Sequence, residues 1–230
     1  SKSLKMMLLL HEGHKAARKF FTPSNSRSYD RVARYATFGR DSAWKRVIIE
    51  AVASRPSVLE LACGTGVLSS MLASSGRSVV GIDLTFEYLR VLRRKLDLPL
   101  SQGTAELLPY RSESFDAVVS SYLAKYVDIG SVADECWRVL RPGGIAVFHD
   151  FTYPEKKVWR GLWNAYFILL RLCGTLASDW KVVFEELNDV IRESSWEKRI
   201  QTTLRNRGFE NIVCEKYAAG TAAIVFAEKP

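Results

Sequence analysis

The chain has 230 residues and a mass of 26.0 kDa, a length that fits one compact domain. Hydrophobic residues make up 47% and charged residues 25%, which excludes a wholly disordered, collagen-like or disulfide-scaffold protein. The net charge is +8, and residues 1–28 carry six basic residues against one acidic residue, so +5 of it lies in this leader. A basic leader suits an anionic surface such as lipid headgroups or nucleic acid, and it equally suits a solvated tail.

The cysteines and the apolar runs bear on the compartment. The run Met6–Leu10 is too short for a bilayer span or a signal peptide. We therefore expect a cytoplasmic protein, with a peripheral contact at the inner face of the membrane left open. His11 and His14 lack the i, i+4 spacing of a zinc helix, so no metal site is expected. A reducing setting is favoured because four cysteines lie far apart without a C-x-x-C motif: Cys63, Cys136, Cys173 and Cys214.

The body of the chain alternates strand and helix patterns. A turn-rich stretch at 22–26 separates the leader, residues 1–28, from a body that covers residues 29–230. The alternation predicts an α/β fold with a mostly parallel sheet. The runs 211–217 and 222–226 are joined by a link too short for a parallel crossover, so one C-terminal strand should run antiparallel, as in a hairpin. The other expected strands span 57–62, 78–84, 115–121 and 145–151, with helices beginning near 67, 86, 131 and 157.

A glycine turn follows the first expected strand. In the stretch 58–68, Gly64 and Gly66 allow a tight turn and the approach of a ligand to the backbone. Asp83 ends the second expected strand, where a carboxylate can accept hydrogen bonds from two ribose hydroxyls. Both NAD and S-adenosylmethionine fit these features.

Two details favour S-adenosylmethionine over NAD. The stretch 64–69 lacks the third glycine of the G-x-G-x-x-G motif, on which a dinucleotide site depends for close helix packing. Glu60 is an acid inside an apolar strand and requires a partner if it is buried. A nearby cation is expected, and the ammonium group of the ligand is a candidate that would act through the loop.

An ordered series of further motifs follows the glycine turn, and with it the chain resembles a class I S-adenosylmethionine-dependent methyltransferase from about Tyr29 to the C-terminus. Within that superfamily it resembles the UbiE group, the C-methyltransferases of ubiquinone and menaquinone biosynthesis. The superfamily motifs are Gly103–Pro109, Phe115–Val118 and Leu140–Gly144. The motifs shared with the group are Tyr29–Tyr35, Ala62, Gly174–Asp179, Gly208–Glu210 and Ala219–Gly220.

The resemblance implies a Rossmann-like fold and assigns cofactor contacts. Thr65 and the backbone of Gly64 and Gly66 would contact the amino-acid end of S-adenosylmethionine, and Asp83 the ribose. The remaining assigned positions are Thr104 and Ala105 beside the adenine and Ser121 at the end of the fourth strand. The group usually carries Asp or Asn where Thr104 stands, and a plain turn hydroxyl is the alternative for this threonine.

The acceptor side departs from the group. After Ser121 the group usually reads aromatic, Gly, apolar, Arg, Asn, whereas this chain has Lys125 and Tyr126 at the last two positions. Because lysine lacks the planar fork of arginine, an altered acceptor or altered acceptor binding is open. His149 and Asp150 end the fifth strand, and alternation lets one of them face the site. The group carries an acid at the second position, so Asp150 is favoured, with His149 packed against a helix.

This resemblance implies a C-methyltransferase that acts on a polyprenylated quinol, most of all demethylmenaquinol. Lys125 would stabilise a phenolate, and Asp150 would act as base directly or through water, with a purely structural role for His149 or Asp150 as the alternative. The apolar helix 158–176 packs against the sheet, and its excess apolar residues either line a channel for a greasy substrate or touch lipid. The alternatives are a methyltransferase of another small molecule or lipid, an RNA methyltransferase, and a non-catalytic or NAD-binding module. No nucleic-acid partner is expected, because the Asn/Asp-Pro-Pro-aromatic turn of exocyclic-amino methylating enzymes and a separate RNA-binding module are both missing.

Overall fold

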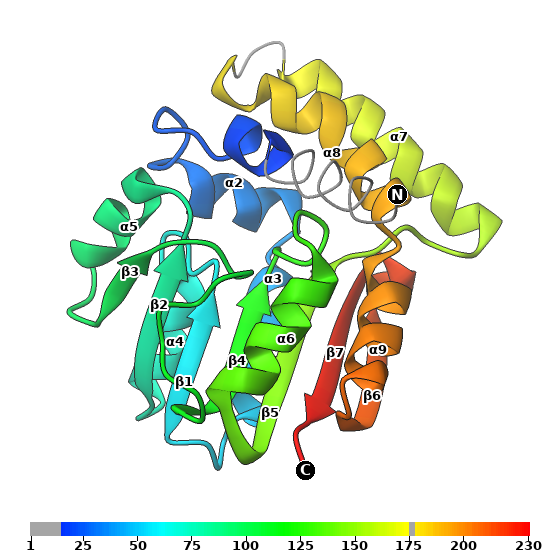
Figure 1. Ribbon diagram of the computed structural model, residues 1–230. Helices are drawn as coiled ribbons and strands as arrows, with labels where there is room; N and C mark the ends of the chain where they lie inside the picture. The colour runs from blue at the N-terminus through cyan, green and yellow to red at the C-terminus, as the bar shows by residue number, and fades with distance from the viewer. Residues whose placement is uncertain (1–14, 175–177) are drawn as a thin grey trace, which may run out of the picture.

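The computed structural model of the protein describes residues 15–174 and 178–230 (Figure 1). Within these residues, one seven-stranded sheet has the order β3-β2-β1-β4-β5-β7-β6. The strands are β1 (Ser57–Leu61), β2 (Ser78–Asp83), β3 (Leu100–Gln102), β4 (Phe115–Ser121), β5 (Leu140–Phe151), β6 (Glu210–Tyr217) and β7 (Ala222–Glu228).

Strand direction agrees with the sequence prediction. Strands β1 to β5 pair in parallel, and β7 runs antiparallel to both of its neighbours, β5 and β6. The mostly parallel α/β sheet and the antiparallel C-terminal strand are therefore confirmed. The three-residue strand β3 was not predicted, since it is too short to show any alternation of apolar and polar residues.

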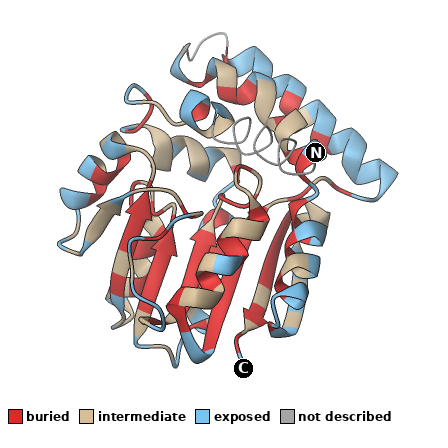
Figure 2. Ribbon diagram, viewed as in Figure 1, coloured by how far each residue is buried: buried red, intermediate tan, exposed pale blue. Residues whose placement is uncertain are grey.

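Helices cover both faces of the sheet and the carboxyl ends of its parallel strands. Apolar residues of α3 and α4 pack on one face, and those of α6 and α9 pack on the other. Helices α2, α7 and α8 lie across the carboxyl ends of the parallel strands (Figure 1), while Figure 2 shows the strands themselves buried. The helices are α2 (Tyr29–Ala36), α3 (Asp41–Ala51), α4 (Val67–Ser74), α5 (Phe86–Arg93), α6 (Ile129–Val139), α7 (Lys157–Gly174), α8 (Lys181–Ser194) and α9 (Trp196–Asn206).

Two of the boundaries that differ from those predicted have local reasons. Helix α6 begins at Ile129, two residues early, because the Asp128 carboxylate caps it by accepting from the Ser131 amide at 2.8 Å. Strand β5 begins at Leu140 rather than 145, because Leu140 pairs with Phe115 before the register between the two strands shifts. The glycine-rich turn at 141–144 therefore lies within β5, where it interrupts the pairing with β4, and does not precede the strand.

The described part of the leader packs against the body. Phe20 is fully buried beside Tyr126, and Asn25 is 1% exposed. The Asn25 side-chain amide donates to the Phe20 carbonyl at 2.7 Å, and its oxygen accepts from the Tyr88 hydroxyl at 2.7 Å. Residues 15–28 therefore supply packing to the fold as well as positive charge.

Several features noted in the sequence lie outside the described residues. They are the apolar run Met6–Leu10, both leader histidines, and residues 175–177 of the Gly174–Asp179 motif. Among the helices that the structure describes, none is long and apolar enough to cross a membrane.

The burial of Phe20 yields a stability prediction. Replacing a fully buried phenylalanine by alanine costs about 3 to 5 kcal/mol through lost apolar burial and the cavity left behind. We expect Phe20→Ala to lower the free energy of unfolding by that amount in urea titration. Leu107→Ala is the control, because Leu107 is 77% exposed and its truncation should change stability by less than about 0.5 kcal/mol. Equal stability of the two variants would show that Phe20 contributes nothing to the folded body.

Candidate active site

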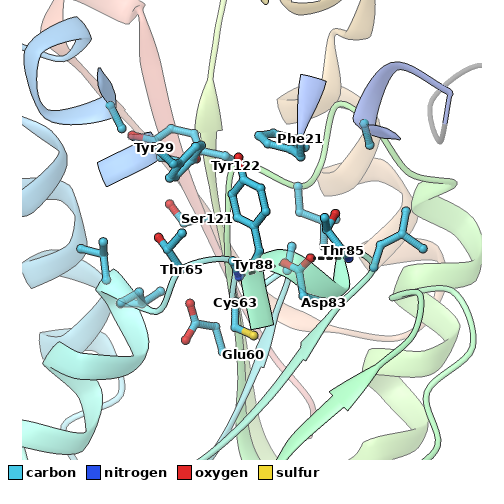
Figure 3. Close-up of a pocket in the computed structure, with 18 of the residues that line it drawn as sticks. Phe21, Tyr29, Glu60, Cys63, Thr65, Asp83, Thr85, Tyr88, Ser121 and Tyr122 are labelled. Atoms are coloured by element: carbon cyan, nitrogen blue, oxygen red, sulfur yellow. Dashed lines mark hydrogen bonds between the residues drawn. The ribbon is translucent and has the colours of Figure 1, made fainter. Parts of the chain in front are cut away.

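A cavity of about 280 Å³ lies at the carboxyl ends of the central parallel strands (Figure 3). Strand β1 pairs with β2 on one side and with β4 on the other, so the connection from β1 to β2 and the connection from β4 to β5 run in opposite directions and leave a crevice between them. The cavity is lined by seven of the eight residues that the sequence assigns to the cofactor: Glu60, Gly64, Thr65, Asp83, Thr104, Ala105 and Ser121.

Gly66, the eighth residue, does not line the cavity and serves the turn instead. Its φ is +83°, and a Cβ added to it would lie 2.0 Å from Leu92 Cδ1 of α5. Gly66 therefore lets α4 start while α5 packs against the loop. Gly64 also has a positive φ, +54°, and its amide points at the Asp83 carboxylate.

Asp83 is held by two backbone amides at the end of β2. Its Oδ2 accepts from the Gly64 amide and its Oδ1 from the Thr85 amide, both at 2.8 Å. Burial raises the pKa of Asp83 to about 6, and the hydrogen bonds from Thr85 and Gly64 oppose this rise. The amides fix the carboxylate at the cavity wall, and it keeps lone pairs for a ligand hydroxyl.

Glu60 lies at the base of the cavity and is 2% exposed (Figure 3). Its carboxylate accepts a hydrogen bond from the Ser69 hydroxyl. Burial raises the pKa of Glu60 to about 8, while Ser69 and the charge of Lys45 oppose the rise. Lys45 of α3 therefore supplies positive charge of the kind that was predicted near Glu60.

A network of charged groups from α2 and α3 borders the same cavity. Asp30 accepts from the Thr65 hydroxyl and pairs with Lys95 at 2.6 Å. Asp41 pairs with Lys45 and also accepts from the Tyr122 hydroxyl at 2.7 Å, a bond that joins α3 to the end of β4. No role for Asp30, Asp41 or Lys45 was predicted from the sequence.

Ser121 and His149 form a pair beside the cavity. Ser121 Oγ lies 2.8 Å from His149 Nδ1, and burial lowers the pKa of His149 well below its ordinary value, so the ring is neutral. The His149 ring packs beside Trp44 of α3, with centroids 5.2 Å apart, as predicted for the residue facing a helix.

A second cavity of about 80 Å³ adjoins the first. The two share the aromatic residues Phe21, Tyr29, Tyr122 and Tyr126, so these rings divide them. The rest of its lining is supplied by Val32, Ala33, Ala36, Thr37, Lys125, Phe151, Trp180, Val183, Phe184 and Leu187. Among these described lining residues, Lys125 is the only charged one.

Lys125 and Asp150 form an ion pair with Nζ and Oδ1 2.5 Å apart, and their side chains are 2% and 0% exposed. Asp150 lines neither cavity and also accepts from the Phe151 amide at 2.8 Å. Burial lowers the pKa of Lys125 and raises that of Asp150, while each charge opposes the shift of the other. In this structure Asp150 therefore holds Lys125, and an acceptor would meet Lys125 first.

The residues missed by sequence analysis come mainly from the segments before β1. Phe21, Tyr29, Asp30 and Asp41 line a cavity together with residues from 60–127, which belong to the later strands and the loops that follow them. Their proximity depends on how α2 and α3 return over the strand ends, which no local periodicity reports. The available signal was the group motif Tyr29–Tyr35, which contains two of them.

Most of the chain can be aligned with known proteins. A family model described as "Methyltransferase domain" matches residues 59–148. Demethylmenaquinone methyltransferase of Paenarthrobacter aurescens is 30% identical over 207 residues, which cover 88% of this chain and 82% of the relative. This chain belongs to the UbiE group of class I S-adenosylmethionine-dependent methyltransferases. It is an enzyme, and its cofactor is S-adenosylmethionine.

Two further comparisons support the family and the fold. The ubiquinone/menaquinone biosynthesis C-methyltransferase UbiE of Geotalea daltonii is 26% identical over 238 residues, which cover 97% of this chain and 100% of the relative. A crystal structure of an S-adenosylmethionine-dependent methyltransferase from Aquifex aeolicus gives a TM-score of 0.63 at 14% identity, with 91% of this chain and 100% of that one covered. The Rossmann-like fold predicted from the sequence is confirmed.

The charged residues that line the larger cavity suit the positive groups of S-adenosylmethionine, the cofactor of this methyltransferase. Five acidic residues line it against two basic ones, Arg34 and Lys45. Even with Glu60 mostly protonated near neutral pH, four carboxylates outnumber the two cations, so the cavity favours a ligand that carries a sulfonium and an ammonium group. The acidic residues are Asp30, Asp41, Glu60, Asp83 and Glu106.

The raised pKa of Asp83 yields a pH prediction. A ribose hydroxyl donates best to the ionised carboxylate, and this form is lost as the pH falls through about 6. We expect the affinity for S-adenosylmethionine, measured by calorimetry, to weaken by up to about tenfold per pH unit below that value. Asp83→Asn should bind more weakly by about 1.5 to 3 kcal/mol near neutral pH and lose this dependence. An unchanged pH profile in the variant would remove Asp83 from the cofactor contacts.

Proposed function

We propose that this methyltransferase transfers a methyl group to a ring carbon of a polyprenylated quinol, with demethylmenaquinol as the foremost substrate. The observation that carries the proposal is the apolar, aromatic second cavity that adjoins the cofactor cavity and holds one charged residue, Lys125. The relatives named demethylmenaquinone methyltransferase support the same acceptor class.

For the cofactor, we propose the contacts assigned from the sequence, with one change. Asp83 holds the ribose, Thr65 and the Gly64 backbone hold the amino-acid end, and Gly66 acts by shaping the turn. The other positions are Glu60 below the loop, Thr104 and Ala105 beside the adenine, and Ser121 at the end of β4, all of which line the cavity. When bound, S-adenosylmethionine supplies an electrophilic sulfonium methyl group.

The protein's part in the chemistry is to favour a phenolate and to exclude water. A ring carbon becomes nucleophilic when the adjacent hydroxyl loses its proton, and Lys125 can donate a hydrogen bond to the resulting oxyanion. Neutralisation of opposite charges is favoured where water is excluded, and the rings between the cavities exclude it. After the carbon–carbon bond forms, the ring proton passes to the oxygen of the resulting dienone, which restores the aromatic quinol, and the proton first taken from the hydroxyl is the one released.

The role that we propose for Asp150 differs from the one predicted from the sequence. Because it lines neither cavity, it orients Lys125 and receives the hydroxyl proton through that residue rather than by contact with the acceptor. Tyr122 lines both cavities, and burial together with the Asp41 charge raises its pKa, so its hydroxyl stays protonated and donates to Asp41. Tyr122 is thus a fixed wall between cofactor and acceptor.

A lipid quinol places the enzyme at a membrane. We propose a cytoplasmic enzyme with a peripheral contact at the inner face, to which the basic leader adds positive charge. The rival acceptor is RNA, favoured by the +8 charge alone. Parallel assays on lipid extract and on transfer RNA, with mass spectrometry of the products, separate the two.

The Lys125–Asp150 pair yields the test of the acceptor site. We expect Lys125→Met to lower single-turnover methylation of demethylmenaquinol in detergent by about 10- to 1000-fold, because the oxyanion loses its cation, with cofactor affinity unchanged. Removing one partner of a buried ion pair costs about 3 to 5 kcal/mol of stability, so a loss of activity alone is ambiguous.

A double variant resolves this ambiguity. Lys125→Met with Asp150→Asn leaves no buried charge and keeps a side-chain oxygen for the Phe151 amide, so the fold should be largely restored. Its turnover should stay low if the cation is what matters. Lys198→Met, at a 70% exposed lysine, is the control. Full turnover of the double variant would reject the role of Lys125, and no product from the wild type would reject the quinol.

A further inference from the structure

Helix α7 carries large apolar side chains on the side that faces away from the protein. Its inner side packs Trp163 and Phe167 against Ile191 and Leu187 of α8. A row of apolar residues runs along the outer side: Val158, Leu162, Ala165 and Leu169. Their spacings of four, three and four place them on one side of the helix. Packing against the protein core therefore does not account for this row.

The exposure of these side chains is large. Val158 is 74% exposed, Leu162 56% and Leu169 57%, and they are flanked by Ile168 at 59% and Trp159 at 42%. Helix α7 has 18 residues and extends for about 27 Å, and Figure 2 shows its outer side exposed along most of that length. Contiguous exposed apolar surface of this kind marks an interaction site.

The exposed apolar surface continues onto the segment that follows α2, and there it reaches the edge of the second cavity, the proposed acceptor site. The rings of Phe38, which is 77% exposed, and Tyr166 have centroids 5.8 Å apart. The Tyr166 hydroxyl donates to the Ala36 carbonyl at 2.7 Å, and Ala36 and Thr37 line the second cavity. The α7 surface, which we define as Phe38, Val158, Trp159, Leu162, Ile168 and Leu169, therefore lies at the edge of that cavity.

The charged residues of helix α7 itself have one sign. Helix α7 contains Lys157, Arg160 and Arg171 and no acidic residue, and Lys156 precedes it. Counted by 3.6 residues per turn, Lys157 lies at one edge of the apolar row. Arg160 and Arg171 lie further round the helix, where they donate to the backbone carbonyls of Glu155 and Glu185. An apolar face with a cationic flank and a tryptophan at its edge is the pattern of a helix that lies in a membrane interface.

We propose that the α7 surface docks the enzyme on an anionic lipid bilayer, with α7 parallel to the membrane plane and the edge of the acceptor cavity next to the lipid. This inference rests on the proposed function in one respect, that a quinol with a prenyl tail is dissolved in that bilayer. A second copy of the chain would fit the apolar row, but pairing two α7 helices would bring like charges together, whereas anionic headgroups neutralise them.

The test is co-sedimentation of the full chain with vesicles, without acceptor. We expect binding to vesicles that contain phosphatidylglycerol, weaker binding to pure phosphatidylcholine, and a decrease as salt is raised. Leu162→Gln with Leu169→Gln should weaken binding about tenfold or more by removing inserted apolar surface. Lys156→Gln with Lys157→Gln should weaken it and reduce its salt dependence.

Matched controls locate the contact. Leu107→Gln with Val213→Gln removes apolar side chains that are 77% and 50% exposed elsewhere, and should leave vesicle binding unchanged. Loss of binding in Lys2→Gln with Lys5→Gln, and none in the α7 variants, would assign the contact to the leader and overturn the proposal. Dimerisation of the wild type that the α7 leucine variant abolishes, without vesicle binding, would assign the surface to a second copy.

An activity assay separates this inference from the proposed function. The α7 leucine variant should methylate a short-tailed quinol in detergent at the wild-type rate, and a long-tailed quinol in vesicles about tenfold or more slowly. Vesicle binding without methylation of either quinol would reject the acceptor and leave the docking surface standing. Equal rates of variant and wild type on the vesicle-borne quinol would reject the docking surface and leave the acceptor standing.

Discussion

The reversal of strand order at β1 is the constraint on which the site depends. Because β1 lies between β2 and β4, the connection that follows β1 and the connection that follows β4 run in opposite directions, and neither fills the space between them. The glycine turn after β1, Asp83 at the end of β2 and Ser121 at the end of β4 all open into that space. Their separation along the sequence does not matter, since the parallel pairing brings all three strand ends to one edge.

Charge is divided between the two cavities. Glu60 and Asp83 are buried carboxylates in the cofactor cavity, and their raised pKa values record the cost of holding them there. Lys125 is the charged residue at the second cavity, the proposed acceptor site, and Asp150 behind it offsets its burial. This division matches a donor that arrives positively charged and the proposed quinol acceptor, which would become negative during reaction. In that reaction a carboxylate exposed to the acceptor would oppose formation of the phenolate, and Asp150 lines neither cavity.

The sequence predicted local motifs and the order of the parallel strands. It missed contacts between segments that are far apart in the sequence and meet only when the chain folds back over the strand ends. Alternating apolar runs located six of the seven strands, and the glycine turn and Asp83 both line the larger cavity, which is the proposed cofactor site. The alternation rule separated His149 from Asp150, but it could not show that Lys125 would neutralise Asp150. Asp41 was missed because its partner Tyr122 lies 81 residues away, and no helix pattern reports such a contact.

The aromatic rings between the cavities connect the N-terminal segments to the chemistry. Phe21 comes from the described part of the leader and Tyr29 from α2, while Tyr122 and Tyr126 follow β4. Tyr122 has a φ of +65°, a strained conformation for a tyrosine, and its bond to Asp41 and its stacking on Phe151 hold it there. The wall is therefore assembled only when residues before β1 have folded over the strand ends. Exclusion of water from the reacting groups, which favours the charge-cancelling transfer, depends on that covering layer and not on the sheet alone.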